Sequence, residues 1–245
     1  MALKTAKIIT FTSVKGGTGK TTTVLNIAGL LNNKDLKVLI ADFDFYGGVI
    51  ASSLNLEYKN DVYTFVNDLI NNKFETVDDY VTKFTENIDI LPAPRDPRSA
   101  SKINAKYIEI ILNRLKPKYD VILIDTNHIA SPINLITMDM SDNFYYIITN
   151  TLADLKNMKS MISIFKDMNE EDYRIVLNNS ILNIKTIYSD YDIKNMIKAD
   201  INFTIPKSLY EKNIEKYIYD GKIITMNKVS KYEAYENIIN DFLNK

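Results

Sequence analysis

Cysteine is absent from this 245-residue sequence, and histidine occurs once, as His128. The absence of cysteine excludes disulfide bonds and thiolate metal sites, and one histidine cannot by itself build a histidine metal centre. A reducing cytosol fits a chain without cysteine, and because no targeting segment is visible we expect a cytoplasmic protein. A lone histidine is more typical of a surface or hydrogen-bonded position than of a catalytic base, and we assign His128 no role.

Neither positive nor negative charge dominates the sequence, and no long hydrophobic run occurs in it. Lys plus Arg number 30 and Asp plus Glu number 31, which gives a formal net charge of -1. This balance does not favour a bulk electrostatic grip on DNA or anionic lipid, although it is compatible with a local basic patch. The apolar run Ile8–Phe11 is too short to span a membrane and lacks a cleavage site. We therefore expect no targeting segment and no integral membrane segment.

Short apolar runs alternate with helical patterns along the chain. The predicted strands are Ile8–Val14, Val38–Ala41, Asn87–Leu91, Val121–Ile124, Phe144–Ile148, Ile175–Leu177 and Phe203–Ile205. Helices are predicted over Lys20–Asn33 and Lys102–Lys116, and Asn60–Thr85 is predicted to form one or two helices without a clear strand. The pattern is typical of one α/β domain over residues 1–245, with a mostly parallel sheet covered by helices on both faces. Right-handed crossovers would bring the strand ends to one edge, where ligands usually bind.

A glycine-rich segment, the phosphate loop Ser13–Thr22, joins the first predicted strand to the first predicted helix. Its glycines allow backbone angles closed to other residues and let N–H groups point at phosphate oxygens, next to the positive end of the helix. Lys20 can reach the β and γ phosphates, Thr21 can ligate Mg²⁺, and Thr22 is placed for the α phosphate. The predicted nucleotide-binding residues of this loop are Gly16, Gly17, Thr18, Gly19, Lys20, Thr21 and Thr22.

The general phosphate-loop pattern has glycine where this chain has Val14, and Lys15 precedes the paired glycines. With this departure, Lys15–Thr21 resembles the deviant Walker A motif, K-G-G-x-G-K-[ST], of the ParA/MinD family of partition and positioning ATPases. The resemblance implies ATP and Mg²⁺ as ligands and a homodimer that forms across the nucleotide. It also implies that Lys15 reaches the phosphates of the partner subunit, where its charge would act as an arginine finger does.

Three aspartates that follow predicted strands extend the resemblance. Asp42 and Asp44 look like the family's switch I, in which Asp44 would position the attacking water and Asp42 would support the Mg²⁺ shell. Asp125 ends a run that resembles a Walker B strand and would hold Mg²⁺ through water. The predicted catalytic residues are thus Lys15, Lys20 and Asp44, and the predicted metal site consists of Thr21, Asp42 and Asp125. Thr126–Ile129 departs from the family, which leaves the behaviour of switch II open.

The later part of the chain carries looser resemblances. Arg174–Asn179 resembles the family's strand whose asparagine reads adenine, so Asn178 is the predicted base contact, with the Pro206 backbone along the adenine edge. Leu91–Arg95 resembles a stretch of the CpaE/TadZ branch, which localises pilus-assembly machinery. The terminal stretch Ser230–Lys245 is amphipathic with a net charge of about -1, whereas membrane-surface helices have a cationic polar face. We predict that it docks onto its own domain.

The sequence leaves several functions open. One is an ATPase that works as a dimer with an activating partner protein and positions DNA, pilus or division-site cargo. From Ser180 to the end, ten Lys face nine Asp plus Glu, so no basic excess marks a DNA face there. The alternative is an ATP-binding scaffold that recruits partners without significant turnover. A synthetase-like small-molecule enzyme remains compatible with the scaffold but would not need Lys15, and a nitrogenase-type reductase would need cysteine.

Overall fold

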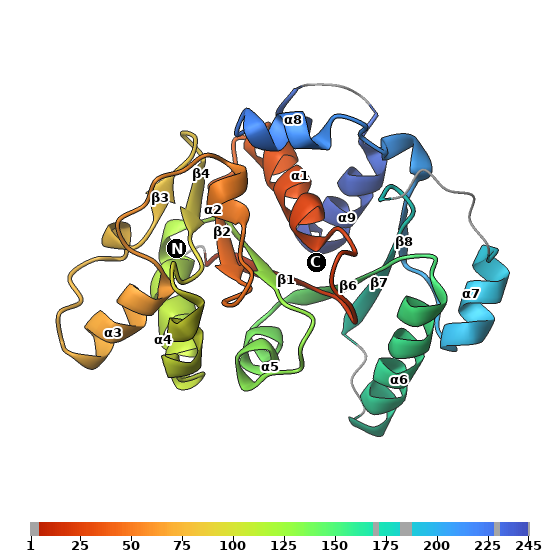
Figure 1. Ribbon diagram of the computed structural model, residues 1–245, viewed down its shortest axis with the longest axis horizontal. Helices are drawn as coiled ribbons and strands as arrows, with labels where there is room; N and C mark the ends of the chain where they lie inside the picture. Colours follow the sequence, from red (N-terminus) through yellow and green to blue (C-terminus); the bar gives the residue numbers. More distant parts are fainter. Residues whose placement is uncertain (1–4, 169–171, 182–187, 228–230, 245) are drawn as a thin grey trace.

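The computed structural model describes residues 5–168, 172–181, 188–227 and 231–244. A single eight-stranded sheet runs through this part of the chain, in the order β3-β4-β2-β5-β1-β6-β7-β8 (Figure 1). The strands are β1 Lys7–Thr12, β2 Val38–Phe43, β3 Thr82–Lys83, β4 Ile88–Leu91, β5 Val121–Thr126, β6 Asn143–Ile148, β7 Tyr173–Asn178 and β8 Phe203–Ile205. The predicted strand Ile8–Val14 thus ends at Thr12, because Ser13 already begins the phosphate loop.

Every strand pair is parallel except β3 with β4, so the predicted mostly parallel sheet is confirmed. The helix expected within Asn60–Thr85 is present at Val62–Ile70, but the segment also holds a short strand without a clear sequence pattern, because Thr82 and Lys83 pair antiparallel with β4 at the sheet edge. Two residues are too few to produce an alternating apolar pattern, so the sequence carried no signal for this hairpin. The carboxyl ends of the parallel strands meet at one edge, which places Asp42 opposite Asp125.

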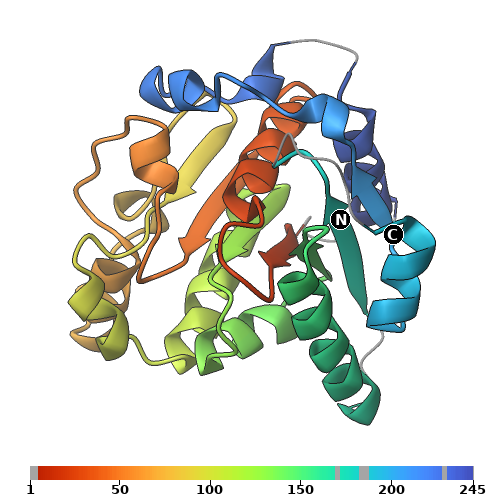
Figure 2. The ribbon, with the colours of Figure 1, turned by 45° about the vertical axis from the view of Figure 1, so that its right-hand side comes forward.

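Helices cover both faces of the sheet (Figures 1 and 2). On one face lie α1 Lys20–Asn32, α2 Ile50–Ser53, α8 Ile214–Tyr219 and α9 Glu233–Leu243. On the other face lie α3 Val62–Ile70, α4 Lys106–Leu115, α5 Pro132–Asp139, α6 Leu152–Met168 and α7 Asp190–Ile197. The 3₁₀ turns are η1 Val77–Asp79, η2 Pro97–Lys102, η3 Lys116–Lys118, η4 Lys207–Leu209 and η5 Ile224–Met226. The predicted helix Lys102–Lys116 therefore begins four residues late, because η2 occupies its start.

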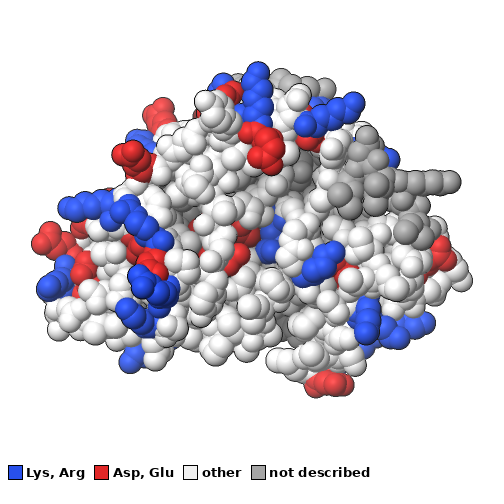
Figure 3. Space-filling model, viewed as in Figure 1, with Lys and Arg blue, Asp and Glu red and all other residues white. Residues whose placement is uncertain are grey.

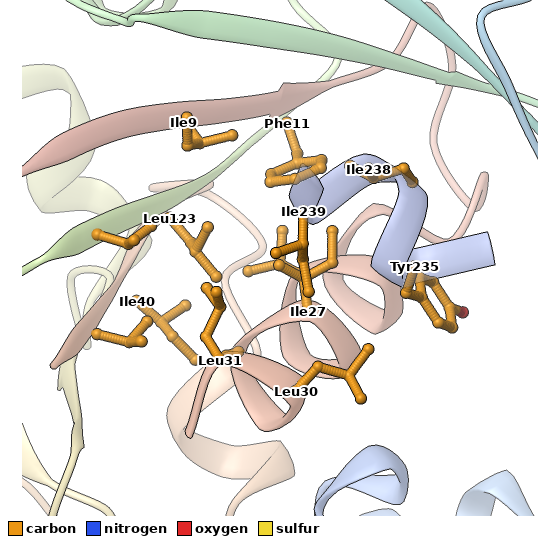
Figure 4. Packing of buried hydrophobic residues seen from close by; sticks show 14 of the residues in the cluster. Ile9, Phe11, Ile27, Leu30, Leu31, Ile40, Leu123, Tyr235, Ile238 and Ile239 are labelled. Atoms are coloured by element: carbon orange, nitrogen blue, oxygen red, sulfur yellow. The ribbon is translucent and has the colours of Figure 1, made fainter. Parts of the chain in front are cut away.

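The C-terminal helix α9 packs beside α1 against the sheet, as Figure 4 shows. Its face of Tyr235, Ile238, Ile239 and Phe242 is buried in the same cluster as Ile9 and Phe11 of β1. The predicted docking of this stretch onto its own domain is confirmed for the described residues 231–244. Within the described chain, no helix is both long and apolar enough to cross a membrane.

Polar contacts fix the orientation of α9. The Tyr145 hydroxyl donates a hydrogen bond to Asp241 at 2.7 Å, and the Arg174 guanidinium lies 3.4 Å from the same carboxylate. The Lys7 ammonium donates to the Phe242 carbonyl at 2.7 Å, close to the helix end. Cations stabilise the C-terminal end of a helix, so these contacts hold α9 at both its flank and its terminus.

Candidate functional site

The phosphate loop leaves β1 at the centre of the sheet and enters α1. Gly17 and Gly19 have φ angles of 74° and 86°, a region that side chains with a Cβ rarely adopt. A Cβ on Gly19 would lie 2.6 Å from the Asn178 Nδ2 atom, so glycine is also required by the close approach of β7. The loop geometry therefore demands glycine at these positions.

Helix α1 begins without a cap. Its N-cap residue is Gly19, no side chain accepts a hydrogen bond from the first turn, and no acidic residue lies in that turn. By contrast, Asp61 caps α3 and Ser131 caps α5. The first N–H groups of a helix lack intrahelical acceptors, and they bind anions where no side chain satisfies them. The first turn of α1 is therefore free to accept an anionic ligand.

The loop also holds a buried cation that forms no direct ion pair, although its charge acts on Asp125. Lys20 is only 9% exposed, and it forms no ion pair with any residue of the described chain. The buried Thr18 hydroxyl likewise has no hydrogen-bond partner among these residues. Buried ammonium groups are almost always paired, because an uncompensated charge is costly to desolvate. Lys20, Thr18 and the start of α1 thus form a set of donors suited to phosphate.

Two carboxylates face this loop from neighbouring strands. Thr21 donates a hydrogen bond from its hydroxyl to Asp125 Oδ2 at 2.5 Å, while Asp125 Oδ1 is buried and has no partner among the described residues. Burial raises the pKa of Asp125 to about 6, against the lowering effects of the Thr21 hydrogen bond and the Lys20 charge. Such a carboxylate is stabilised by a nearby cation.

Asp42 completes the acidic pair. Burial, and then repulsion from Asp125, raises the pKa of Asp42 well above its usual range. Its carboxylate accepts hydrogen bonds from the backbone N–H groups of Ile50 at 3.0 Å and Asp44 at 3.3 Å. Asp44 is partly exposed and accepts a hydrogen bond from the Gly47 N–H at 3.1 Å. The three predicted acidic residues therefore lie together at the loop.

These residues fit Mg²⁺ as it binds in nucleotide sites. No cluster of three or more acidic, histidine or cysteine side chains with metal-binding geometry exists among the described residues. Mg²⁺ commonly keeps several waters and takes its remaining ligands from one or two protein groups and substrate phosphates. The Thr21 hydroxyl and the unpartnered Asp125 oxygen offer that number of protein ligands. Figure 3 shows basic and acidic groups side by side in the hollow at the middle of this face.

The Lys15 side chain makes a contact within its own chain that the sequence did not predict. Its ammonium lies 3.4 Å from the carboxylate of Asp154 and 3.4 Å from the Thr151 hydroxyl, both at the start of α6. Asp154 is fully buried, and Thr149 donates its N–H and its hydroxyl to the same carboxylate. The Thr-x-x-Asp spacing of Thr151 and Asp154 is a capping signal that could have marked the helix start. No sequence pattern linked this helix start to Lys15.

The predicted base contacts lie at the end of β7 and after β8. Asn178 is buried and donates from Nδ2 to the Thr18 carbonyl at 3.0 Å, while its Oδ1 accepts from the Ser180 N–H and hydroxyl. The residue thus braces the phosphate loop. Asn178 pairs in register with Ile205, so the exposed Pro206 follows directly beside it. The adenine-reading role of both residues stays a prediction.

The segment after Asp125 is held by an amide pair. Asn134 Nδ2 donates to Asn127 Oδ1 at 2.9 Å and to the Ile129 carbonyl at 2.7 Å. Asn127 Oδ1 also accepts from the Ile129 N–H at 2.9 Å. His128 is exposed, and its ring lies near Gly16 of the phosphate loop. No sequence pattern predicted that Asn134 would close this loop.

Comparisons with known proteins agree with this geometry. A protein-family model described as an AAA domain matches residues 6–184. The septum site-determining protein MinD of Synechocystis sp. is 37% identical over 121 residues, which cover 49% of this chain and 44% of that relative. Across the first curated relatives, the chain spans about half of their length, from 44% to 56%.

Solved structures share the fold over the whole chain. A ParA family ATPase from Chlorobium tepidum TLS has a TM-score of 0.80 at 20% identity and covers 98% of both chains. MinD from Pyrococcus horikoshii OT3, complexed with Mg-ADP, has a TM-score of 0.76 at 20% identity and covers 97% of this chain and 96% of its own. At this identity the likeness establishes a common architecture.

Proposed function

The chain belongs to the ParA/MinD family of P-loop ATPases, and from that premise we propose that it binds and hydrolyses ATP with Mg²⁺. We further propose that it dimerises across the nucleotide and positions or partitions a cellular cargo in the cytoplasm. The observation that carries the nucleotide proposal is the buried Lys20, which forms no direct ion pair with a residue of the described chain and adjoins an uncapped helix start. The phosphates of a nucleoside triphosphate would pair with Lys20 and accept hydrogen bonds from the start of α1.

Each residue of the site has a definite task in this proposal. Lys20 and the loop N–H groups would hold the β and γ phosphates and stabilise the charge that develops during transfer. Asp44, partly exposed beside the loop, would orient the attacking water. Thr21 and Asp125 would hold Mg²⁺, which when bound would neutralise part of the phosphate charge.

Lys15 supports the dimer part of the proposal. Its side chain is 38% exposed and points to Asp154 of its own subunit, while Lys20 occupies the interior of the loop. A second lysine outside the interior of the loop would be available to the phosphates of a partner subunit. Lys15 would then add positive charge to the transition state from across the interface.

The net charge of the chain helps to decide between DNA and protein as the cargo. A nearly neutral chain does not favour DNA as the main partner, because non-specific DNA binding rests on many phosphate contacts. We therefore favour a protein-recruiting role at a division site or pilus, with DNA partition as the other member of this class. The Synechocystis relative is a septum site-determining protein, and Leu91–Arg95 is the sole sequence feature that points to pilus machinery.

Phosphate release tests the enzyme proposal. We expect wild-type protein with ATP and Mg²⁺ to release phosphate slowly, and Asp44→Ala protein to bind ATP with similar affinity but release none above background. The measurement is repeated in the presence of a candidate activating partner. Equal rates for wild type and Asp44→Ala under both conditions would refute hydrolysis.

A scaffold without turnover is the second candidate, and the amide pair after Asp125 favours it. Asn127 and Asn134 tie this segment to itself, which would restrain a switch that must respond to the γ phosphate. The same phosphate-release assay separates the candidates, since a scaffold would bind ATP and form dimers without hydrolysis.

The cargo is tested with trapped dimers. Asp44→Ala protein with ATP and Mg²⁺ should remain dimeric, and its retardation of DNA is compared with ATP and ADP at low and moderate salt. A shift that requires ATP and weakens steeply with salt would make this a partition ATPase. The absence of a shift from demonstrably dimeric protein would support protein recruitment.

A further inference from the structure

A groove of about 730 Å³ runs between α5 and α6, on the face of the sheet opposite α1. The two helices lie side by side in Figures 1 and 2. Side chains of both helices form its walls, and Phe144 and Tyr146 of β6 form its floor. One end touches Ser13 and Val14 of the phosphate loop, and the rest follows the helices away from that loop. We call this space the α5–α6 groove.

The walls of the α5–α6 groove are mainly apolar. They include Leu135 and Met138 from α5 and Met161, Ile164 and Phe165 from α6. Methionine side chains are flexible and polarizable, so they adapt their packing to ligands of different shape. A concave space of several hundred Å³ with mostly apolar walls and a few polar groups is typical of a small-molecule site. The size and lining of the groove therefore suit an apolar small molecule.

The charges on the lining disfavour an anionic ligand. Besides His128, the charged side chains that line the groove within the described chain are Asp139 and Asp172, and both are acidic. No lysine or arginine of this part of the chain lines the groove. A carboxylate or phosphate that entered it would lose hydration without gaining a cationic partner, which is costly. A ligand for this groove therefore carries no negative charge.

The Tyr146 hydroxyl is a second, independent sign of a ligand. Tyr146 lines the floor and is only 4% exposed, and no described residue forms a hydrogen bond with its hydroxyl. Burial alone raises the pKa of Tyr146 above its usual range. This hydroxyl is not among the enclosed polar atoms that lack a partner, so it keeps accessible surface. Buried tyrosine hydroxyls usually have a hydrogen-bond partner, and a ligand in the groove would supply one.

We propose that the α5–α6 groove binds an apolar small molecule that carries a hydrogen-bonding group and no negative charge. The apolar body of the ligand would pack between Leu135 and Met138 of α5 and Met161 of α6. Its polar group would form a hydrogen bond with the Tyr146 hydroxyl at the floor. The ligand would be distinct from ATP, because the acidic lining of the groove repels phosphates.

A second copy of the chain is the competing occupant of the groove. Leu135 and Ile164 are about half exposed at its mouth, and a partner surface could cover them. The position of Tyr146 favours a small molecule over a second copy. A flat protein surface would cover the mouth of the groove without reaching a hydroxyl on its floor.

The absence of tryptophan from the chain allows a direct test by fluorescence. Ile164→Trp places a single reporter on the wall of the groove, at a side chain that is 47% exposed. Ile110→Trp places the reporter on α4, at a side chain that is 39% exposed and lies outside the groove, and serves as the matched control. Both full-length proteins are titrated with decanol, decylammonium and decanoate, which share one chain length and differ in charge. Each probe is kept below the concentration at which it forms micelles.

We expect decanol and decylammonium to change the emission of Ile164→Trp with saturation, and Ile110→Trp to show no saturable change. Decanoate should bind at least about tenfold more weakly than decanol. Added to Ile164→Trp, Tyr146→Phe should weaken decanol about three- to tenfold, because one hydrogen bond is lost. Asp139→Lys should narrow the difference between decanoate and decanol, because it replaces an acid of the lining by a cation. Circular dichroism verifies that each variant is folded before its titration is interpreted.

Several results would overturn the proposal. One is the lack of a saturable response to decanol and decylammonium in folded Ile164→Trp, and another is a preference for decanoate. Unchanged affinity for decanol in Tyr146→Phe would remove the hydroxyl from the site and, with it, the stated class of ligand. An emission of Ile164→Trp that depends on protein concentration without any probe, together with a nucleotide-independent dimer in light scattering, would assign the groove to a second copy of the chain.

Discussion

Asp125 should make the metal-free protein more stable in mild acid than at neutral pH. Burial raises its pKa from 3.8 to about 6, so the fold prefers the protonated carboxyl. Its favourable contribution is complete below the unfolded pKa and is lost as the pH rises through about 6. A shift of about two units corresponds to about 3 kcal/mol of unfolding free energy. Roughly half of this, on the order of 1 kcal/mol, should already be regained at pH 5.

Thermal unfolding in the presence of EDTA at pH 7.5 and pH 5 tests this reasoning. For a chain of this length, a change on the order of 1 kcal/mol corresponds to a rise in Tm of roughly 2–4 °C between the two pH values. Asp125→Asn removes the titrating group while an amide oxygen can still accept the Thr21 hydrogen bond. The variant should therefore melt higher than wild type at pH 7.5 and lose this part of the pH dependence. Asp167→Asn, which alters an exposed carboxylate, is the matched control.

With Mg²⁺ and nucleotide bound, wild type should become more stable at pH 7.5 than at pH 5, whereas Asp125→Asn should not show this reversal. A bound cation favours the ionised carboxylate, so it should raise the Tm of wild type at pH 7.5 more than that of Asp125→Asn. If wild type and Asp125→Asn have the same Tm at each pH in EDTA, ionisation of the buried Asp125 carboxyl does not destabilise the fold. The raised pKa of Asp42 acts in the same direction, so only the difference between wild type and Asp125→Asn isolates Asp125.

Three further variants address separate parts of the molecule. Lys15→Ala should keep its affinity for a fluorescent ATP analogue but lose the ATP-dependent dimer in light scattering, and a dimer that persists would exclude Lys15 from the interface. Gly19→Ala should weaken nucleotide binding by about tenfold or more in calorimetry, since its φ of 86° and its approach to Asn178 leave no room for a methyl group. Phe242→Ala should lower the urea unfolding free energy by about 3–5 kcal/mol, because the ring is fully buried under α9; a loss below about 1 kcal/mol would contradict the docking of this helix.

The phosphate loop was predictable because its signal is local. Glycine spacing, the lysine and the following helix all lie within ten residues of sequence, and the structure confirms the strand-to-helix turn they predict. The meeting of Thr21 with Asp125 spans more than a hundred residues. It could still be foreseen, since parallel strands bring their carboxyl ends to one edge. Strand order then decides which acids are neighbours, and β2 pairs with β5.

Contacts between side chains from unrelated elements were beyond the sequence. Asp154 pairs with Lys15 because α6 starts beside the phosphate loop. The position of α6 in turn depends on the pairing of β6 with β1 in the sheet. The same holds for the Tyr145 and Arg174 contacts that secure Asp241 of α9. The amphipathic pattern predicted that α9 would dock, and only the packed structure shows what its polar flank contacts. Local patterns specify elements, whereas pairing across elements depends on tertiary packing.

The contact between Lys15 and Asp154 would have to be exchanged in the proposed dimer. The lysine side chain is 38% exposed, whereas Asp154 is fully buried. Thr149 donates its N–H and its hydroxyl to one oxygen of the Asp154 carboxylate, and the other oxygen has no hydrogen-bond partner in the described chain. Removal of the lysine would therefore leave a buried carboxylate without its counter-charge, which is costly. We therefore expect Lys15 to leave Asp154 only where the phosphates of a partner subunit offset that cost.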